Sequence, residues 1–167
     1  NSKPHDRSAL PPLYTIPVVV HVIHLGEPVG TGSNISDAQI LDAINGLNER
    51  FANNNGQGAD CEIDFCLATQ TPDGCPTNGI NRVNGSGVPD YAIEGIEFNT
   101  SCGADEAAIK ELSRWSPLEY YNVWVVHDIC GDWAGYAHFP NGGDLDGTVI
   151  GKEFMHGDAK TLAHELG

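Results

Sequence analysis

The chain has 167 residues, 40% of them hydrophobic, and its 8 Lys and Arg residues against 23 Asp and Glu residues give a formal net charge of −15. This is the length and composition of one globular domain, and the scattered basic residues, no two of them adjacent, argue against nucleic acid as a partner. A membrane span is excluded because the longest apolar run, 16–23, is far shorter than the roughly 20 residues that a bilayer requires.

The N-terminal end shows no secretory signal, so we expect a processed product or an excerpt of a longer protein. Residues 1–13 combine charge and proline without periodicity, which predicts an extended arm. Residues 14–167 are expected to form the folded part. Within them, residues 15–24 are β-branched and apolar on both faces, which predicts a central strand.

A helix is predicted next, because Ser36 and Gln39 have the spacing of a capping box. Its apolar stripe consists of Ile40, Ile44, Leu47 and Phe51, and it ends in the Asn-rich segment 53–56. Residues 61–69 then alternate, which predicts a second strand with one apolar face formed by Ile63, Phe65 and Leu67.

The second half of the chain continues the alternation of strands and helices. A loop-rich segment with a short strand at 79–83 is followed by a helix over 104–115, with Ala108, Leu112 and Trp115 on one face and Ser116-Pro117 at its end. Further strands are predicted at 120–127 and 147–154, and a last helix begins after Asp158. This order predicts an α/β protein with a largely parallel sheet.

Five cysteines without a C-x-x-C pair favour disulfides formed in an oxidising compartment. The odd number leaves one thiol free or paired outside the chain. Cys61 and Cys66 are five residues apart in a strand-like run and point to opposite faces, so we do not expect them to bond to each other.

The last residues, 161–167, contain His164 and Glu165 and match the first half of an H-E-x-x-H zinc motif. In that motif two histidines on one helical face share a zinc ion, and the glutamate reaches the water to be activated. The chain stops where the second histidine would stand. From these few residues alone, a His-Glu pair on the surface at the end of a helix is an equally good interpretation.

Several ordered blocks of the chain resemble the pappalysin family of metzincin zinc peptidases, above all its secreted bacterial branch, the cytophagalysins. The blocks lie at 16–24, 30–40, 47–51, 79–82, 121–125, 135–140, 146–150 and 161–165. They cover nearly everything after Tyr14, in the order of the family.

The resemblance implies a metzincin-like N-terminal subdomain: a mostly parallel twisted sheet with an antiparallel edge strand, a backing helix and the start of the active-site helix. It makes 14–167 the N-terminal part of a catalytic domain. His164 would be one of three histidine ligands of Zn²⁺ and Glu165 the general base that activates water for peptide hydrolysis. The other ligands and the methionine turn would follow Gly167, because Met155 precedes the helix.

The same resemblance implies that residues 135–140 form the edge strand over the cleft, with Gly135, Tyr136, Ala137 and His138 binding an extended protein or peptide substrate. It also implies a secreted, extracellular enzyme. We expect this chain alone to be inactive. Ca²⁺ has no supporting motif, since an EF-hand loop is absent. The alternative function is a secreted, non-catalytic binding domain on the same scaffold.

Overall fold

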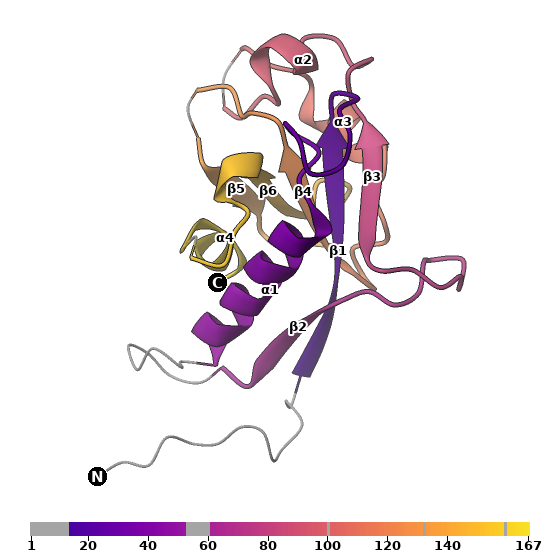
Figure 1. The fold of residues 1–167 in the computed structure, drawn as a ribbon, viewed down its shortest axis with the longest axis vertical. Helices are drawn as coiled ribbons and strands as arrows, with labels where there is room; N and C mark the ends of the chain where they lie inside the picture. Colours follow the sequence, from indigo (N-terminus) through magenta and orange to yellow (C-terminus); the bar gives the residue numbers. More distant parts are fainter. Residues whose placement is uncertain (1–13, 53–60, 100, 132, 159) are drawn as a thin grey trace.

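The computed structural model describes residues 14–52, 61–99, 101–131, 133–158 and 160–167 (Figure 1). The arm expected at 1–13 lies outside these residues. Six strands form one sheet in the order β2-β1-β4-β6-β5, and β3 also pairs with β1. The strands are β1 (Tyr14–His24), β2 (Ile63–Leu67), β3 (Ile80–Asn84), β4 (Tyr121–Val126), β5 (Gly135–His138) and β6 (Gly147–Gly151).

The central strand is β1, as its sequence predicts. It pairs in parallel with β4 on one side, and with β2 and then β3 on the other. Residues 18–23 are buried on both faces, which explains the apolar pattern without alternation. β4 pairs in parallel with β6, whereas β5 runs antiparallel to β6 at the edge. The predicted α/β class, with a mostly parallel sheet and one antiparallel edge strand, is confirmed.

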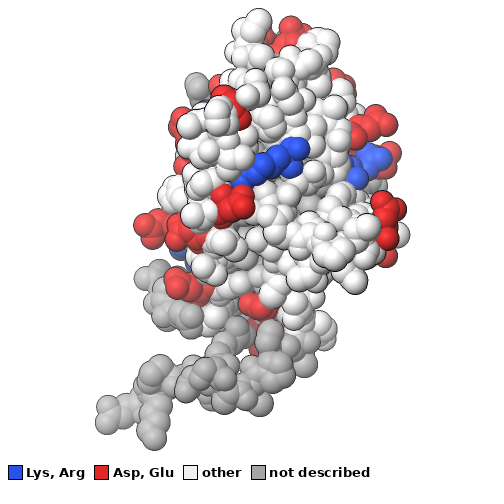
Figure 2. Space-filling view, turned by 45° about the vertical axis from the view of Figure 1, so that its right-hand side comes forward, with Lys and Arg blue, Asp and Glu red and all other residues white. Residues whose placement is uncertain are grey.

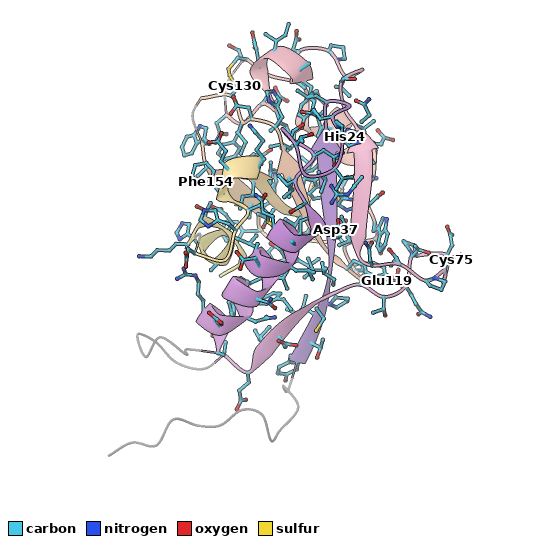
Figure 3. All side chains as sticks on the ribbon, in the orientation of Figure 1. His24, Asp37, Cys75, Glu119, Cys130 and Phe154 are labelled. Atoms are coloured by element: carbon cyan, nitrogen blue, oxygen red, sulfur yellow. A yellow bond between two sulfur atoms is a disulfide. The ribbon has the colours of Figure 1, made fainter. Side chains whose placement is uncertain are left out.

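Helices cover both faces of this sheet. α1 (Asp37–Phe51) and α4 (Lys160–Leu166) lie together on one face (Figure 1) and enclose a core that includes Val20, Ile44 and Leu162. Side chains fill the space between α1 and the strands (Figure 3). The opposite face packs against the segment that contains α2 (Tyr91–Glu94) and α3 (Glu106–Glu111), in a second core around Trp124 and Ile109.

The start of α1 confirms half of the predicted capping box. The Ser36 hydroxyl accepts a hydrogen bond from the Gln39 backbone N–H. The Gln39 side chain does not return to the cap, because its amide donates to the carbonyl of Lys152, after β6. Ser36 therefore caps the helix as predicted, whereas Gln39 connects the helix to the segment that follows β6.

The helix expected over 104–115 is shorter and faces differently. α3 ends at Glu111, its buried residues are Ile109 and Lys110, and Leu112 is 40% exposed. Two local interactions explain the difference. Asp105 caps the helix through the N–H of Ala108, and the Asn122 side chain of β4 binds both the N–H and the carbonyl of Trp115. Trp115 is therefore held by the sheet instead of continuing the helix.

The expected strand over 147–154 is also shorter, because a 3-10 turn, η2 (Lys152–Phe154), replaces its last residues. α2 was not predicted from the sequence. Ala159, at the predicted start of the last helix, lies outside the described residues.

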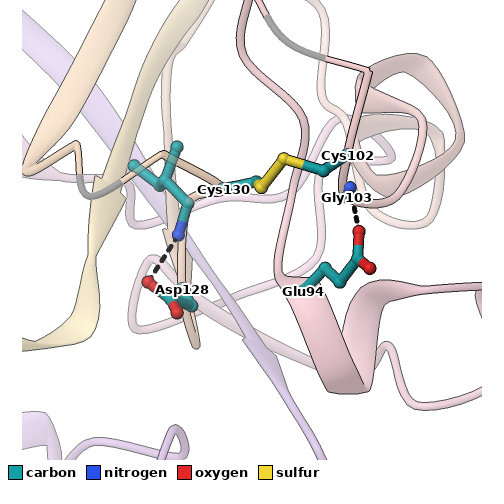
Figure 4. The surroundings of a disulfide bond; sticks show 6 residues. Glu94, Cys102, Gly103, Asp128 and Cys130 are labelled. Carbon is teal, nitrogen blue, oxygen red and sulfur yellow. Dashed lines mark hydrogen bonds between the residues drawn. A yellow bond between two sulfur atoms is a disulfide. The ribbon is translucent and has the colours of Figure 1, made fainter.

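A disulfide joins Cys102 to Cys130, with their Cα atoms 6.1 Å apart (Figure 4). It ties the loop before α3 to the segment after β4, where Ile96 also bridges to Ala104 and Ile129. This confirms that a disulfide forms, and the bond involves neither Cys61 nor Cys66. The expectation of one leftover cysteine is wrong, because Cys61, Cys66 and Cys75 all lie outside this bond. Cys75 lies on a loop that projects from the body of the molecule (Figure 3).

The surface carries more acidic than basic side chains, in line with the net charge of −15. Figure 2 shows acidic side chains around the visible face and few basic ones. No helix in the described part of the chain is long and apolar enough to cross a bilayer.

Candidate active site

The helix α4 carries His164 and Glu165. It packs through Leu162, which is buried in the core beneath the sheet, and through Ala163 and Leu166. The His164 side chain is exposed, and Glu165 is half-buried. The apolar side of the helix therefore faces the sheet and leaves the imidazole on the solvent side.

Residues of α1 hold the segment that leads into α4. The Asp42 carboxylate accepts a hydrogen bond from the N–H of Gly157 at 2.8 Å, and the Arg50 guanidinium donates to the carbonyl of Asp158 at 2.9 Å. Between them on the helix, Gly46 lies so close to Gly157 that any Cβ would collide with its carbonyl oxygen. These three residues, four apart, form one stripe that fixes where α4 begins.

This stripe was not predicted from the sequence. A signal for it exists, because glycine inside a helix costs about 1 kcal/mol relative to alanine and indicates a close approach of another backbone. Gly46 is such a glycine.

The N-terminal end of β5 lies against α4. A Cβ built on Gly135 would stand 3.2 Å from Cγ2 of Thr161 and 3.6 Å from Cγ of Glu165. Thr161 and Glu165 are one helical turn apart and therefore present one face of α4 to the strand. The structure thus places the predicted base on a helix that lies beside the predicted substrate strand, on the side that Gly135 faces.

The outer edge of β5 pairs with no described strand. The N–H of Gly151 donates to the carbonyl of Ala134, and the register aligns Tyr136 with Val149. Antiparallel ladders alternate, so Tyr136 and His138 bond to β6, whereas the N–H and C=O groups of Gly135 and Ala137 point to the open edge. Among the described residues, the outward backbone groups of Gly135, which is buried, and of the half-buried Ala137 therefore pair with no other strand.

The side chains of Tyr136 and His138 lie on the other face of the sheet, toward α3. Tyr136 is buried and stacks on Phe98 with ring centroids 3.9 Å apart. Burial raises the pKa of Tyr136, and the neighbouring Glu106 raises it further. His138 Nε2 stands 2.9 and 3.1 Å from the two carboxylate oxygens of Glu106. Both side chains are thus engaged by the protein itself.

Around His164 the described residues supply one imidazole and one neighbouring carboxylate. Three possible ligand side chains meet within 4.8 Å elsewhere, at Glu94, Cys102 and Cys130, but there the two sulfurs are bonded to each other (Figure 4). The side chains on α4 are of a type that binds zinc, since imidazole nitrogen is a preferred zinc ligand. Their number is smaller than the three protein ligands of a catalytic zinc site.

Two hollows in the surface lie away from α4. One, of about 630 Å³, is formed by the loop 71–77 and residues 111–115, and another, of about 250 Å³, lies beside the starts of β1 and β4. Neither is lined by His164 or Glu165. The candidate site is thus an open strand edge beside a helix.

Neither a family model nor a curated protein matches the chain. Solved structures do. Mature mirolysin of Tannerella forsythia in complex with a cleaved peptide superimposes with a TM-score of 0.70 and 29% identity over 92% of this chain and 61% of that chain. Mirolysin in complex with a small compound gives a TM-score of 0.67 at 29% identity, with the same coverage. A promirolysin mutant gives 0.67 at 27% identity, over 92% of this chain and 54% of that one.

The fold is metzincin-like. The similarity to mirolysin supports the metzincin superfamily, and the mostly parallel sheet with its antiparallel edge pair agrees with the fold expected from the sequence blocks. The chain spans 61% of the length of the mature mirolysin that it matches.

Proposed function

We propose that this chain is the N-terminal part of the catalytic domain of a secreted zinc endopeptidase of the pappalysin family, with His164 as a zinc ligand and Glu165 as the general base. The observation that supports the proposal is that β5 and α4 lie side by side, with Gly135 facing Glu165: a Cβ built on the glycine would stand 3.6 Å from Cγ of the glutamate. A catalytic base has to lie next to the bound peptide, and an open edge is where an extended peptide binds.

In this reaction Glu165 accepts a proton and later donates one. Zinc, when bound, supplies Lewis-acid polarisation of the attacking water and of the scissile carbonyl. The Glu165 carboxylate takes a proton from the water as it attacks the peptide carbon, and then delivers a proton to the departing amine nitrogen. Its neighbour His164 contributes one exposed imidazole to the metal.

The backbone of β5 binds the peptide in this proposal. The outward N–H and C=O groups of Gly135 and Ala137 would pair with an extended peptide, adding it to the sheet as a further strand. Such pairing does not depend on side chains, so it suits a broad range of protein substrates. The mirolysin complex with a cleaved peptide supports a peptide ligand for this fold.

The remaining zinc ligands belong, in this proposal, to residues that follow Gly167, and the chain alone is inactive. The Cys102–Cys130 disulfide supports an extracellular location, since such bonds persist in oxidising compartments. The rival function is a non-catalytic binding domain on the same scaffold.

The test is Glu165→Gln in the longer protein, with Glu49→Gln on the exposed side of α1 as the matched control. The amide keeps the shape of the side chain but cannot accept the proton, so we expect retained zinc and a kcat at least about 100-fold lower. The control should keep full turnover. Normal turnover in Glu165→Gln would exclude this residue as the base, and a parent that binds peptides without cleaving them would support the rival function.

A further inference from the structure

An ionic cluster holds β5 from the face opposite α4. His138, the last residue of the strand, meets both carboxylate oxygens of Glu106, the first residue of α3. The same carboxylate accepts a hydrogen bond from Lys110 Nζ at 2.8 Å. Glu106 is therefore shared between the edge strand and the helix beneath it.

Lys110 anchors this cluster in the core. Its side chain is fully buried, its ammonium donates to the carbonyl of Leu145 at 2.6 Å, and it lies 4.6 Å from the ring centre of Trp124 in β4. Burial lowers the pKa of Lys110, while Glu106 opposes the shift. A buried ammonium needs a fixed counter-charge, so the Glu106 carboxylate has little freedom to move.

The cluster acts where β5 leaves the sheet. The next residue, Phe139, is 91% exposed, so His138 is the last side chain of the strand that is packed against the protein. At the other end, Gly135 rests on α4. The four-residue strand is thus held at its start from one face and at its end from the other.

We propose that Glu106 and His138 are positioning residues that hold the open edge of β5 at the level of Glu165, so that a peptide paired with Gly135 and Ala137 lies next to the catalytic base. This inference rests on the proposed peptidase function. It concerns residues that face away from α4 and act only through the strand. Releasing His138 would loosen the end of β5, so a long peptide would pair less well there, while the peptide bond beside Glu165 keeps its place.

The test compares His138→Leu, which removes the donor, with His138→Gln, which keeps one, in the full-length protein. Each variant is assayed on a peptide long enough to lie along β5 and on a short peptide that does not reach His138. For His138→Leu we expect the KM of the long peptide to rise at least about threefold with little change in kcat, and the KM of the short one to stay the same. His138→Gln should restore the KM.

Zinc content and melting temperature show whether each variant is folded, and His156→Leu, at an exposed position, serves as the control. Glu106→Gln offers a second route, because it removes the charge that both partners share, and it should raise the same KM. A normal KM for the long peptide in folded His138→Leu or in folded Glu106→Gln would overturn the inference. A parent that cleaves no peptide at all would instead contradict the proposed function.

Discussion

Gly135 of β5 faces Glu165 of α4, and a Cβ built on the glycine would come within van der Waals distance of the glutamate side chain. A Cβ at position 135 would stand 2.9 Å from the carbonyl oxygen of Val149, 3.2 Å from Thr161 and 3.6 Å from Glu165. The first of these distances is too short for a real contact. A side chain at position 135 would therefore collide with the backbone of β6 and pack against α4.

Gly135→Ala is expected to destabilise the protein. The added methyl group meets backbone on one side and α4 on the other, and such overpacking costs about 1–3 kcal/mol. Gly87→Ala is the matched control, because a Cβ there has no atom within 4 Å. Chemical denaturation of both variants measures the difference in unfolding free energy. Equal stability of the two would show that β6 and α4 leave room for a side chain at position 135.

The parts of the fold that were predicted correctly are those whose signals are local. Ser36 identifies the start of α1 through its own cap, and the run 18–23 identifies a strand that is buried on both faces. For Ser36 and for 18–23, the sequence pattern and the structure involve the same few positions. The zinc ligand His164 and the base Glu165 were also proposed from adjacent residues, and their roles stay predictions.

The errors in the predicted fold arise where contacts between residues far apart in the sequence determine the structure. Lys110 occupies the core because Glu106, the carbonyl of Leu145 and the ring of Trp124 surround its ammonium, and no helical pattern predicts a buried lysine. The contact between His138 and Glu106 was not predicted either, because the two residues lie 32 apart in the chain. Pairings of this kind depend on the sheet order, which the sequence alone does not reveal. The substrate contact expected of His138 stays a prediction.

A buried histidine makes the stability of the protein depend on acidity. His21 has no exposed surface, stacks on Trp124 and bonds through Nε2 to the Asn122 side-chain oxygen at 2.8 Å. Burial lowers its pKa from 6.5 to about 4. The unfolded chain therefore binds a proton at this residue below pH 6.5, whereas the folded chain does not until about pH 4.

Stability is accordingly expected to fall as the pH decreases from 6.5 to 4, by roughly 3 kcal/mol from this residue alone. His21→Gln keeps a donor for Asn122 but does not titrate in this range, so its unfolding free energy should change less over the same interval. Denaturant titrations at several pH values measure both slopes, with His156→Gln at an exposed position as the control. Parallel slopes for wild type and His21→Gln would exclude His21 as the cause.

Zinc binding by the 167-residue chain is expected to be weak. One imidazole and one carboxylate cannot replace the three protein ligands of a catalytic zinc ion. After dialysis against metal-free buffer, elemental analysis should find well below one zinc per chain, and casein should remain uncleaved. Stoichiometric zinc together with metal-dependent cleavage would show that the described residues complete a site by themselves. His164→Ala should remove whatever weak binding remains.

The open edge of β5 leads to the last prediction. The N–H of Ala137 points away from β6, so Ala137→Pro removes a donor that no described strand uses and leaves the ladder to β6 intact. In the full-length protein we expect kcat/KM to fall for every peptide of a mixed library, because pairing through the main chain does not depend on side chains. Zinc content and melting temperature should change little. Ala137→Ser, which keeps the N–H, is the control and should cleave the library normally. If only some peptides were affected, this segment would form a side-chain pocket, and if none were affected in a folded variant, peptides would bind elsewhere.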